Sequence, residues 1–540
     1  MRIVLVSISL FCCQLLTAQT APMRFWVQFS DKANSSFSVD HPNAFLTGNA
    51  IARREKMGIP ITEEDIPVST DYINQVLDLG EIYYLHESKW FNSISILVPD
   101  SALMLQVSAL PFVVSTRQVK QLKTSPVPEA MHQRSNETIV PSEYGESLRQ
   151  IEMLNGLPLH ALGYQGEGMN IGVLDAGFRF VNILPVFENA RSEFRIAGLN
   201  DFVDLDLNVD GHSNHGTYVL STMAGYAEGE LIGTAPNASY FLFRTEDSDS
   251  EFIIEEDNWV AGIERCDFLG MDLVNSSLGY STFDNPEQNH SYADMDGETT
   301  RISIAARIAS RKGMIVVTSA GNSGASAWKY ITAPGDAKEI ITVGAVDAEE
   351  KHAAFSSFGP SFDGRVKPDV MAMGAAATFA SLDSTFIQGN GTSFASPILC
   401  GMTACLWQAN PNKSNTEIMD AVKQSAHLYT APNDSMGYGI PNFWTAHLLL
   451  READTSNDSE LTLYPNPTSG NVRFELEVSD SDEPRNVRVY DASGRIVYDQ
   501  CFEVLEDQVL GELQLPSDLT TGTYFVEVSG VVSRLLFLKE

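Results

Sequence analysis

The central part of the chain, residues 145–450, alternates short apolar runs with longer helix-like stretches. The strand-like runs lie at 170–174, 239–243, 273–276, 314–318 and 340–343. These runs are mostly apolar and do not alternate with polar residues, which is typical of strands that are buried on both faces. The pattern predicts an α/β domain in which helices cover both sides of a parallel sheet.

The flanking regions follow other patterns. Residues 22–118 combine strand-like runs, such as 25–29 and 93–98, with helix-like stretches, which predicts a small α+β domain. A polar stretch with several prolines at 119–144 suits an exposed linker that is open to proteolysis. Residues 458–540 contain short alternating runs separated by glycine turns, a pattern that predicts an all-β sandwich.

The first 18 residues have the pattern of a secretory signal peptide. Arg2 provides a charged start, an apolar run follows, and small residues end the segment at Ala18. Lipidation at Cys12 or Cys13 is an alternative, but the preceding Phe11 fits a lipidation motif poorly. No other stretch reaches about 18 consecutive apolar residues, so we expect no transmembrane segment.

Composition narrows the class of partner. The 540 residues exceed what one core normally holds, so several domains are expected. A formal net charge of −35 argues against nucleic acid and anionic membrane surfaces as partners and favours solubility outside a cell.

Four cysteines lie beyond the signal peptide: Cys266, Cys400, Cys405 and Cys501. They indicate neither a disulfide scaffold nor a zinc site, and their pairing is left open.

The candidate chemistry starts from a serine in a glycine-rich segment. Ser393 follows Gly389 and Gly391 and precedes a long apolar run, so a sharp turn would place it at the start of a buried helix. Unpaired backbone N–H groups and the positive end of the helix dipole favour a developing oxyanion there. A serine-rich loop before a core helix would show the same pattern.

Two upstream residues could activate this serine. Asp175 ends the apolar run at 170–174, which fits a carboxylate at the C-terminal edge of a buried strand. His215 opens a helix of small residues and could face Asp175. A serine hydroxyl is a weak nucleophile unless a histidine takes its proton and a carboxylate orients that histidine. Taken singly, such an Asp is usually a cap and such a His is usually structural.

Three motifs in this order resemble those of the subtilisin-like serine peptidases, or subtilases. They are Val-Leu-Asp-Ala-Gly at 173–177, His-Gly-Thr at 215–217 and Gly-Thr-Ser-Phe-Ala-Ser-Pro at 391–397. Among known triad orders, Asp before His before Ser is that of subtilisin. The resemblance implies a secreted serine endopeptidase made as a zymogen, in which Ser393 attacks the peptide carbonyl, His215 moves the proton and Asp175 orients His215.

The same resemblance assigns further residues. Asn322, which follows a strand-like run in a glycine-bounded turn, would donate its side-chain amide to the oxyanion beside the Ser393 N–H. Ser277, Leu278 and Gly279 resemble the segment that pairs with the substrate backbone. Asparagine in such a turn is otherwise a common left-handed residue.

The resemblance also gives roles to the flanking regions. Residues 22–118 would be a pro-domain that acts as folding helper and inhibitor, with maturation in the linker at 119–144. Residues 458–540 open with Tyr-Pro-Asn-Pro and resemble the C-terminal sorting domain of type IX secretion. The implied partners are polypeptide substrates and the type IX machinery, and the implied location is outside the cell or on its surface. An accessory binding sandwich is the alternative for the last region.

Some interpretations differ from this one. A catalytically silent surface-binding protein and an esterase with the same triad are the rival functions. Tyr218 stands where many subtilases have a second histidine, and we take the position as structural.

Metal binding is a further alternative. A metal cluster could be formed by Asp210, His212 and His215, although an acidic loop before the histidine fits better. No cofactor is required by the resemblance, and a structural calcium ion is allowed. Carboxylates for calcium are offered by Asp201, Asp204, Asp206, Asp210 and the run at 247–256, without an assigned ligand set.

Overall fold

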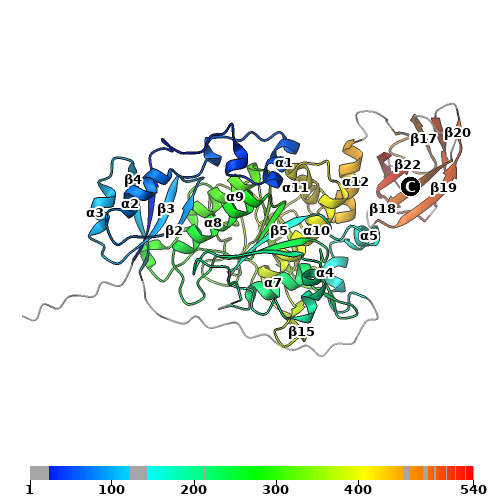
Figure 1. Ribbon diagram of the computed structural model, residues 1–540. Coiled ribbons are helices and arrows are strands. Elements are labelled where there is room, and N and C mark those ends of the chain that lie inside the picture. The colour runs from blue at the N-terminus through cyan, green and yellow to red at the C-terminus, as the bar shows by residue number, and fades with distance from the viewer. Residues whose placement is uncertain are drawn as a thin grey trace, which may run out of the picture.

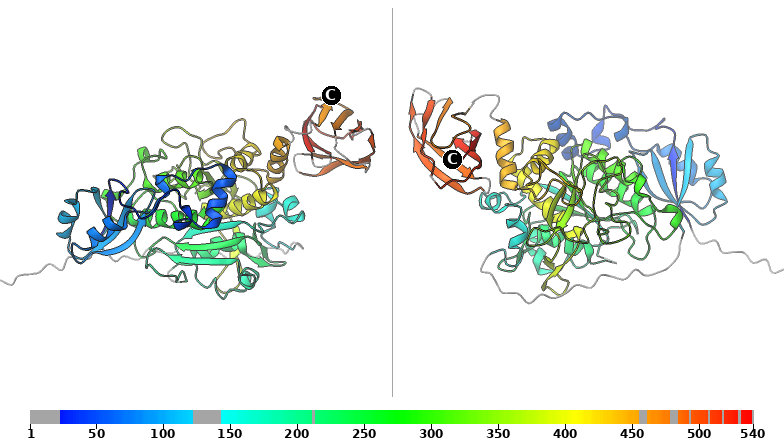
Figure 2. Two further views of the ribbon diagram at one scale, coloured as in Figure 1. Left: turned by 45° about the horizontal axis from the view of Figure 1, so that its top comes forward. Right: turned by 180° about the vertical axis from the view of Figure 1, so that it is seen from behind.

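The structure is a computed structural model that describes residues 23–121, 143–210, 213–454, 461–477, 484–491, 494–505, 508–516, 518–528 and 531–538. Three folded parts follow one another: an N-terminal domain, a large central domain and a C-terminal domain (Figure 1). The two flanking domains lie at opposite ends of the central one in every view (Figure 2). The predicted signal peptide and most of the predicted linker lie outside the described residues.

The central domain is built on a seven-stranded parallel sheet with the order β13-β12-β11-β10-β5-β9-β6. Its strands are β5 (Asn170–Asp175), β6 (Ile196–Asp201), β9 (Ser239–Arg244), β10 (Leu273–Ser276), β11 (Ile315–Ser319), β12 (Ile341–Val346) and β13 (Val370–Met373). Every residue of β10, β11, β12 and β13 is buried, which explains why their mostly apolar sequences do not alternate with exposed polar residues. The predicted α/β class is confirmed.

Helices cover both faces of this sheet (Figure 1). They are α4 (Leu148–Glu152), α5 (Leu157–Ala161), α6 (Glu188–Ser192), α7 (His215–Ala224), α8 (Ile254–Leu269), α9 (Arg301–Arg311), α10 (Thr392–Ala409), α11 (Asn415–Gln424) and α12 (Phe443–Asp454). Successive residues of β11 enter opposite cores: Val317 packs in the core that holds α7 and α10, and Val316 packs in the core that holds α8 and α9. Two short hairpins complete the domain: β7 (Tyr226–Ala227) with β8 (Leu231–Ile232), and β14 (Ala377–Ala380) with β15 (Phe386–Gly389).

The strand order reverses beside the central strand β5. The chain runs outward from β5 to β6 and β9 and then returns to β10 on the other side of β5. In open parallel sheets, ligands bind at the carboxyl ends of the strands where such a reversal opens a crevice. The ends of β5 and β10, with the residues that follow them, are therefore the expected location of a site.

The N-terminal domain is an antiparallel sheet with short helices. Its elements are β1 (Met23–Phe29), α1 (Gly48–Met57), α2 (Thr70–Leu77), β2 (Tyr83–Ser88), β3 (Ser93–Val98), α3 (Leu103–Ser108) and β4 (Val113–Gln121), with the strand order β2-β3-β1-β4. Strand β4 extends to Gln121, although the predicted linker begins at residue 119. The strand continues because Lys120 still pairs with Arg24 of β1.

Charged groups are buried where the N-terminal domain meets α8. Asp267 of α8 accepts ion pairs from Arg53 and Arg54, both at 2.7 Å, and from Lys89 at 2.6 Å. Glu264, one helical turn earlier, accepts the Lys89 backbone N–H at 2.8 Å and the hydroxyl of Ser88 at 2.5 Å. Two carboxylates of one helix thus bind the N-terminal domain through both its side chains and its backbone.

The C-terminal domain consists of two antiparallel four-stranded sheets, β16-β17-β21-β20 and β19-β18-β22-β23. Its strands are β16 (Thr462–Tyr464), β17 (Val472–Glu477), β18 (Arg485–Asp491), β19 (Ile496–Phe502), β20 (Val504–Leu505), β21 (Gln508–Leu513), β22 (Gly522–Val528) and β23 (Val531–Phe537). Phe474 of one sheet and Val489 and Val526 of the other share one apolar core, as in a sandwich. Among the described residues, no helix is long and apolar enough to cross a membrane.

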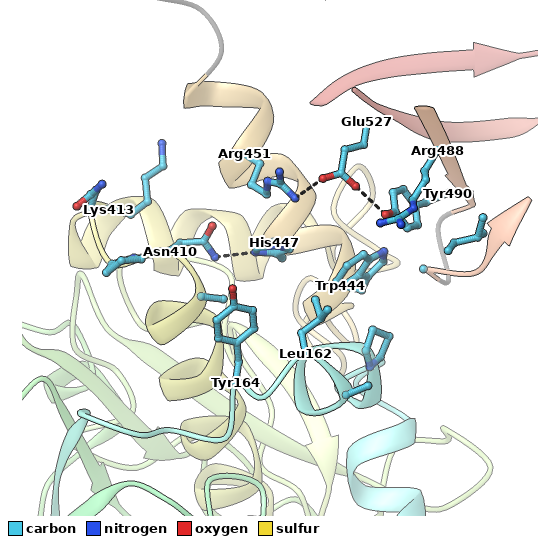
Figure 3. A pocket seen from close by; sticks show the side chains of 17 residues that line it. Leu162, Tyr164, Asn410, Lys413, Trp444, His447, Arg451, Arg488, Tyr490 and Glu527 are labelled. Carbon is cyan, nitrogen blue, oxygen red and sulfur yellow. Dashed lines mark hydrogen bonds and ion pairs between the residues drawn. The ribbon is translucent and has the colours of Figure 1, made fainter. Parts of the chain in front are cut away.

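The C-terminal domain meets the central domain at α12. Glu527 of β22 lies between Arg451, at 2.9 Å, and the Tyr490 hydroxyl, at 2.6 Å (Figure 3). Trp444 packs edge-on against Tyr490, and a Cβ added to Gly494 would come within 2.3 Å of the Trp444 ring. Beside these contacts is a cavity of about 680 Å³ that is lined by both domains.

Candidate active site

Asp175 and His215 are brought together by two elements that are distant in sequence. Asp175 is the last residue of β5 and is fully buried, and His215 is the first residue of α7. The Asp175 Oδ1 lies 2.7 Å from the His215 Nδ1, so the ring N–H on that side points to the carboxylate. The other ring nitrogen, Nε2, is then the one that can accept a proton. This is the arrangement that the sequence predicted for the two residues.

The carboxylate also tunes the imidazole. Burial alone would lower the pKa of His215, because the charged ring is poorly solvated, but the negative charge of Asp175 and its hydrogen bond favour the imidazolium and raise that pKa overall. The His215 side chain remains 35% exposed, whereas that of Asp175 is 0% exposed. A buried anion thus supports a proton acceptor that can still reach a bound molecule.

Ser393 lies in the first turn of α10, two residues after the N-cap residue Gly391. Its Oγ donates to the Ser277 carbonyl at 3.3 Å, and the Ser277 Oγ donates to the Ser393 carbonyl at 2.8 Å. Pro397 explains the second bond: it lies four residues after Ser393 in the helix and has no N–H to offer the Ser393 carbonyl, so Ser277 supplies the donor. Helices α7 and α10, which begin near His215 and Ser393, pack against each other.

Asn322 faces the start of the same helix. Its side-chain Oδ1 accepts the backbone N–H and the hydroxyl of Thr392, both at 2.9 Å. Because a backbone N–H can only donate, the oxygen must face Thr392 and the Nδ2 must point away from it. The positive φ of this turn belongs to Gly321, at 101°, so Asn322 is not needed there as a left-handed residue.

Gly391 marks the space between the two expected oxyanion donors. A Cβ built on Gly391 would lie 3.6 Å from the Ser393 nitrogen and 3.8 Å from the Asn322 Nδ2. The backbone N–H of Ser393 and the side-chain amide of Asn322 therefore border one small volume. Asn322 is exposed, so this volume is open to a ligand.

Ser277, Leu278 and Gly279 follow β10 at the carboxyl edge of the sheet. Ser277 is buried, Leu278 is half-buried and Gly279 is exposed, so the segment rises from the core to the surface. The Leu278 carbonyl accepts the Ser319 hydroxyl at 3.4 Å. The predicted substrate-binding segment thus lies against Ser393 through Ser277 and becomes accessible one residue later.

Carboxylates suited to a metal ion gather at one place among the described residues. Ligand oxygens of Glu246, Glu251 and Glu255 lie within 4.8 Å of one another. Burial raises the pKa of each, that of Glu251 to about 7, and the charges of neighbouring carboxylates raise it further. Asp201 and Asp204, also considered for calcium, bind Arg244 at 2.7 and 2.6 Å. Bound calcium stays a prediction.

Other sequence-based alternatives concern the loop before His215 and the cysteines. His212 lies outside the described residues, while the Asp210 carboxylate accepts the Phe180 N–H and His215 faces Asp175. Those contacts give Asp210 and His215 partners within the protein. Burial raises the thiol pKa of three free cysteines, Cys266, Cys400 and Cys405, and Cys501 is free and exposed.

Comparison with known proteins assigns each part of the chain. The Subtilase family matches residues 166–439, the Peptidase S8 propeptide domain of Bacteroidota matches 24–137, and the Secretion system C-terminal sorting domain matches 462–534. The first match alone covers just over half of the chain.

Individual relatives agree with these matches. Subtilisin NAT of Bacillus subtilis subsp. natto is 28% identical over 346 residues, covering 63% of this chain and 81% of that protein. Subtilisin DY of Bacillus licheniformis is 28% identical over 292 residues, covering 54% and 93%. A thermostable alkaline protease of Halalkalibacterium halodurans is 24% identical over 391 residues, covering 72% and 92%.

Proposed function

The chain belongs to the subtilase family, and on that premise we propose that Asp175, His215 and Ser393 form the catalytic triad with which it cleaves peptide bonds. It is a serine endopeptidase made with a propeptide and directed by its sorting domain to the cell surface or the extracellular space. The observation that carries the proposed triad is the 2.7 Å contact between buried Asp175 and partly exposed His215.

In the proposed reaction, the Ser393 Oγ attacks the peptide carbonyl while His215 Nε2 takes its proton. The oxyanion of the tetrahedral intermediate accepts hydrogen bonds from the Ser393 N–H and the Asn322 Nδ2. His215 then protonates the leaving amine, which leaves an acyl-enzyme on Ser393. Water, deprotonated by His215, attacks that ester and releases the second product. Asp175 stabilises the imidazolium at both stages.

The flanking domains have proposed roles as well. The N-terminal domain packs on α8 through buried contacts, which supports its action as an inhibitor and folding helper that occupies the catalytic domain before maturation. Maturation is proposed within 119–144, most of which lies outside the described residues. A structural calcium ion is proposed without assigned ligands.

The nucleophile is tested by labelling purified protein with a fluorophosphonate and locating the modified peptide by mass spectrometry. We expect the label on Ser393 of the wild type, no label and no peptide hydrolysis in Ser393→Ala, and normal behaviour in Ser326→Ala, which removes an exposed serine hydroxyl. Hydrolysis that persists in Ser393→Ala would refute the assignment. Comparing peptide and ester substrates of the same sequence separates a peptidase from an esterase.

Replacing Asn322 tests the oxyanion site independently. Asn322→Ala should lower kcat by roughly 10²–10³ with little change in KM, a magnitude established on subtilisin itself for loss of a side-chain oxyanion donor. The loss appears in kcat because the amide binds charge that forms only in the transition state. Steady-state kinetics on one peptide substrate measure it. An increase in KM at constant kcat would make Asn322 a ground-state binding residue.

A further inference from the structure

The last described strand of the N-terminal domain buries two consecutive side chains at the catalytic domain. Val119 and Lys120 of β4 are 0% and 3% exposed. Neighbouring side chains of an extended strand point to opposite sides, so this segment is enclosed from two directions. The chain then continues into the proposed maturation region. A lysine is rarely buried to this extent without a dedicated partner.

Lys120 occupies a pocket of the catalytic domain. Its Nζ forms an ion pair with Asp247 and donates to the Ser250 Oγ at 2.7 Å. The ammonium also lies 5.7 Å from the centre of the Phe252 ring. All three pocket residues belong to the loop that connects β9 to α8. The carboxylate, hydroxyl and aromatic face together match the charge and the aliphatic stem of a lysine.

The loop that forms the pocket is held in shape by its own hydrogen bonds. The Asp247 backbone N–H donates to the Glu255 carboxylate at 2.9 Å, and the Ser250 hydroxyl donates to the Asp247 carboxylate at 3.0 Å. Burial would raise the pKa of Asp247, but the contact with Lys120 outweighs this and lowers it. The position of the Asp247 carboxylate is thus fixed by residues of the catalytic domain, which remain after the N-terminal domain is removed, while a bound lysine lowers its pKa.

This loop adjoins the proposed catalytic residues. The Thr245 N–H, just after β9, donates to the Asp175 carbonyl at 3.0 Å. The next residue, Glu246, accepts the hydroxyl of Tyr280, and Tyr280 directly follows the segment that begins at Ser277. The Lys120 pocket is thus part of the same edge of the sheet as Asp175 and the proposed substrate-binding segment.

The backbone beside Lys120 is bound as well. The Gln288 Nε2 donates to the carbonyls of Gln118 and Val119, both at 3.3 Å, while its Oε1 accepts the Ile253 N–H at 3.2 Å. The Val119 side chain joins a buried apolar cluster that includes Trp259. Backbone hydrogen bonds combined with separate pockets for neighbouring side chains are how proteins recognise extended peptides.

We propose that Asp247 and Ser250 form a lysine-selective subsite of the substrate cleft, which Lys120 occupies until maturation. This inference rests on the proposed peptidase function. The preferred substrates of the mature enzyme are polypeptides with an apolar residue followed by lysine, at a fixed distance on the N-terminal side of the cleaved bond. Lysine is favoured over arginine because the Asp247 Oδ1 accepts the Asp249 N–H at 3.3 Å, which leaves Oδ2 and the Ser250 hydroxyl for a compact ammonium in place of two free carboxylate oxygens for a planar guanidinium.

The test is cleavage-site profiling of the mature enzyme on a denatured protein digest, read by mass spectrometry. Wild type should show lysine enriched at one position upstream of the cleaved bond. Asp247→Asn should lose this enrichment and lower kcat/KM on a lysine-containing peptide about tenfold, less than for a fully buried charge pair because Asp247 keeps some contact with water. Asp249→Asn, the same charge change at an exposed neighbour, should keep the wild-type profile.

A second variant, in which the two charges are exchanged, keeps the test decisive if Asp247→Asn fails to fold. The full-length double variant Asp247→Lys, Lys120→Asp restores an opposite pair, and its mature form should prefer an acidic residue at the same position. Cleavage without a lysine preference, or a preference that Asp247→Asn leaves intact, would overturn the subsite. Absence of all cleavage in wild type would instead overturn the peptidase function on which it rests.

Discussion

The two domains that flank the catalytic domain are attached to it in different ways. The N-terminal domain uses charges removed from water: the side chains of Asp267 and Arg54 are 0% and 1% exposed. The C-terminal domain combines the packing of Trp444 against Tyr490 with ion pairs at the surface: the side chains of Arg534 and Glu452, 3.1 Å apart, are 50% and 31% exposed. Water screens the second kind of contact and hardly reaches the first.

The difference fits the proposed roles of the two domains. A buried ion pair adds little net stability, because desolvation offsets the attraction, but loss of one partner leaves an uncompensated charge and is costly. The N-terminal interface therefore accepts only a correctly placed partner, which suits an inhibitor that must fit one surface. The C-terminal interface tolerates change, which suits a domain whose role is in export.

The largest effect that tests this comparison is expected from Asp267→Asn. In the full-length Ser393→Ala background, which prevents processing, this change removes the anion that buried Arg53, Arg54 and Lys89 share, and, among the described residues, only Arg54 keeps a second carboxylate, that of Asp65. The free energy of opening the interface should fall by roughly 3–5 kcal/mol. Hydrogen exchange of the α1 and β2 amides, followed by mass spectrometry, measures this opening. Protection unchanged from the parent would show that the buried network does not hold the domain.

A second, intermediate effect concerns pH. His86 of β2 is buried and binds Asn258 of α8 at 2.9 Å, and burial lowers its pKa to about 4. Because the ordinary value is about 6.5, the opened state binds the extra proton first, and stability is lost as the pH falls from about 6.5 to 4. His86→Gln keeps a side-chain N–H donor for Asn258 but does not titrate. The decrease in the free energy of opening at low pH should therefore be smaller by about 1–3 kcal/mol in the variant.

The measurement for His86 is amide protection of β2 at several pH values in parent and variant. Burial raises the pKa of nearby Glu264 to about 7. Glu264 therefore has the opposite effect, because the interface becomes less stable as the pH rises and this carboxyl group loses its proton. That contribution is present in both proteins and cancels in their difference. Parallel pH profiles would mean that His86 does not titrate at this interface.

The smallest effect is expected at the C-terminal interface. Glu527→Gln removes the ion pair with Arg451, whose side chain is 26% exposed, while an amide can still accept from Tyr490. The free energy of opening around β22 should fall by about 1 kcal/mol or less. The same hydrogen-exchange experiment measures this decrease, and Glu452→Gln, at a more exposed position, is the control. A loss as large as that of Asp267→Asn would remove the distinction between the two interfaces.

Much of the fold follows from local sequence. The strands β10 and β11 begin with apolar residues and do not alternate in polarity, so their positions and their parallel arrangement could be predicted from the pattern of apolar residues. The contact between Asp175 and His215 was predicted from the end of a buried strand and the start of a helix. Strand β6, at the edge of the sheet, was not predicted because its residues alternate in exposure and include Gly198.

The interfaces between domains could not be predicted. Asp267 and Lys89 are 178 positions apart, and each in isolation has the pattern of an ordinary surface charge. Lys120 was assigned to an exposed linker because its neighbours are polar, and only the tertiary contact with Asp247 shows that it is buried. The exchange of hydrogen bonds between Ser277 and Ser393 likewise depends on Pro397 being placed inside α10.

The most direct test is the mass and N-terminal sequence of purified wild type and Ser393→Ala after parallel incubation at neutral pH. The proposed triad predicts that wild type loses its N-terminal domain by cleavage within residues 119–144, while Ser393→Ala stays intact at its N-terminal domain. Cleavage of Ser393→Ala at the same bond and rate, in a preparation free of other peptidases, would contradict it.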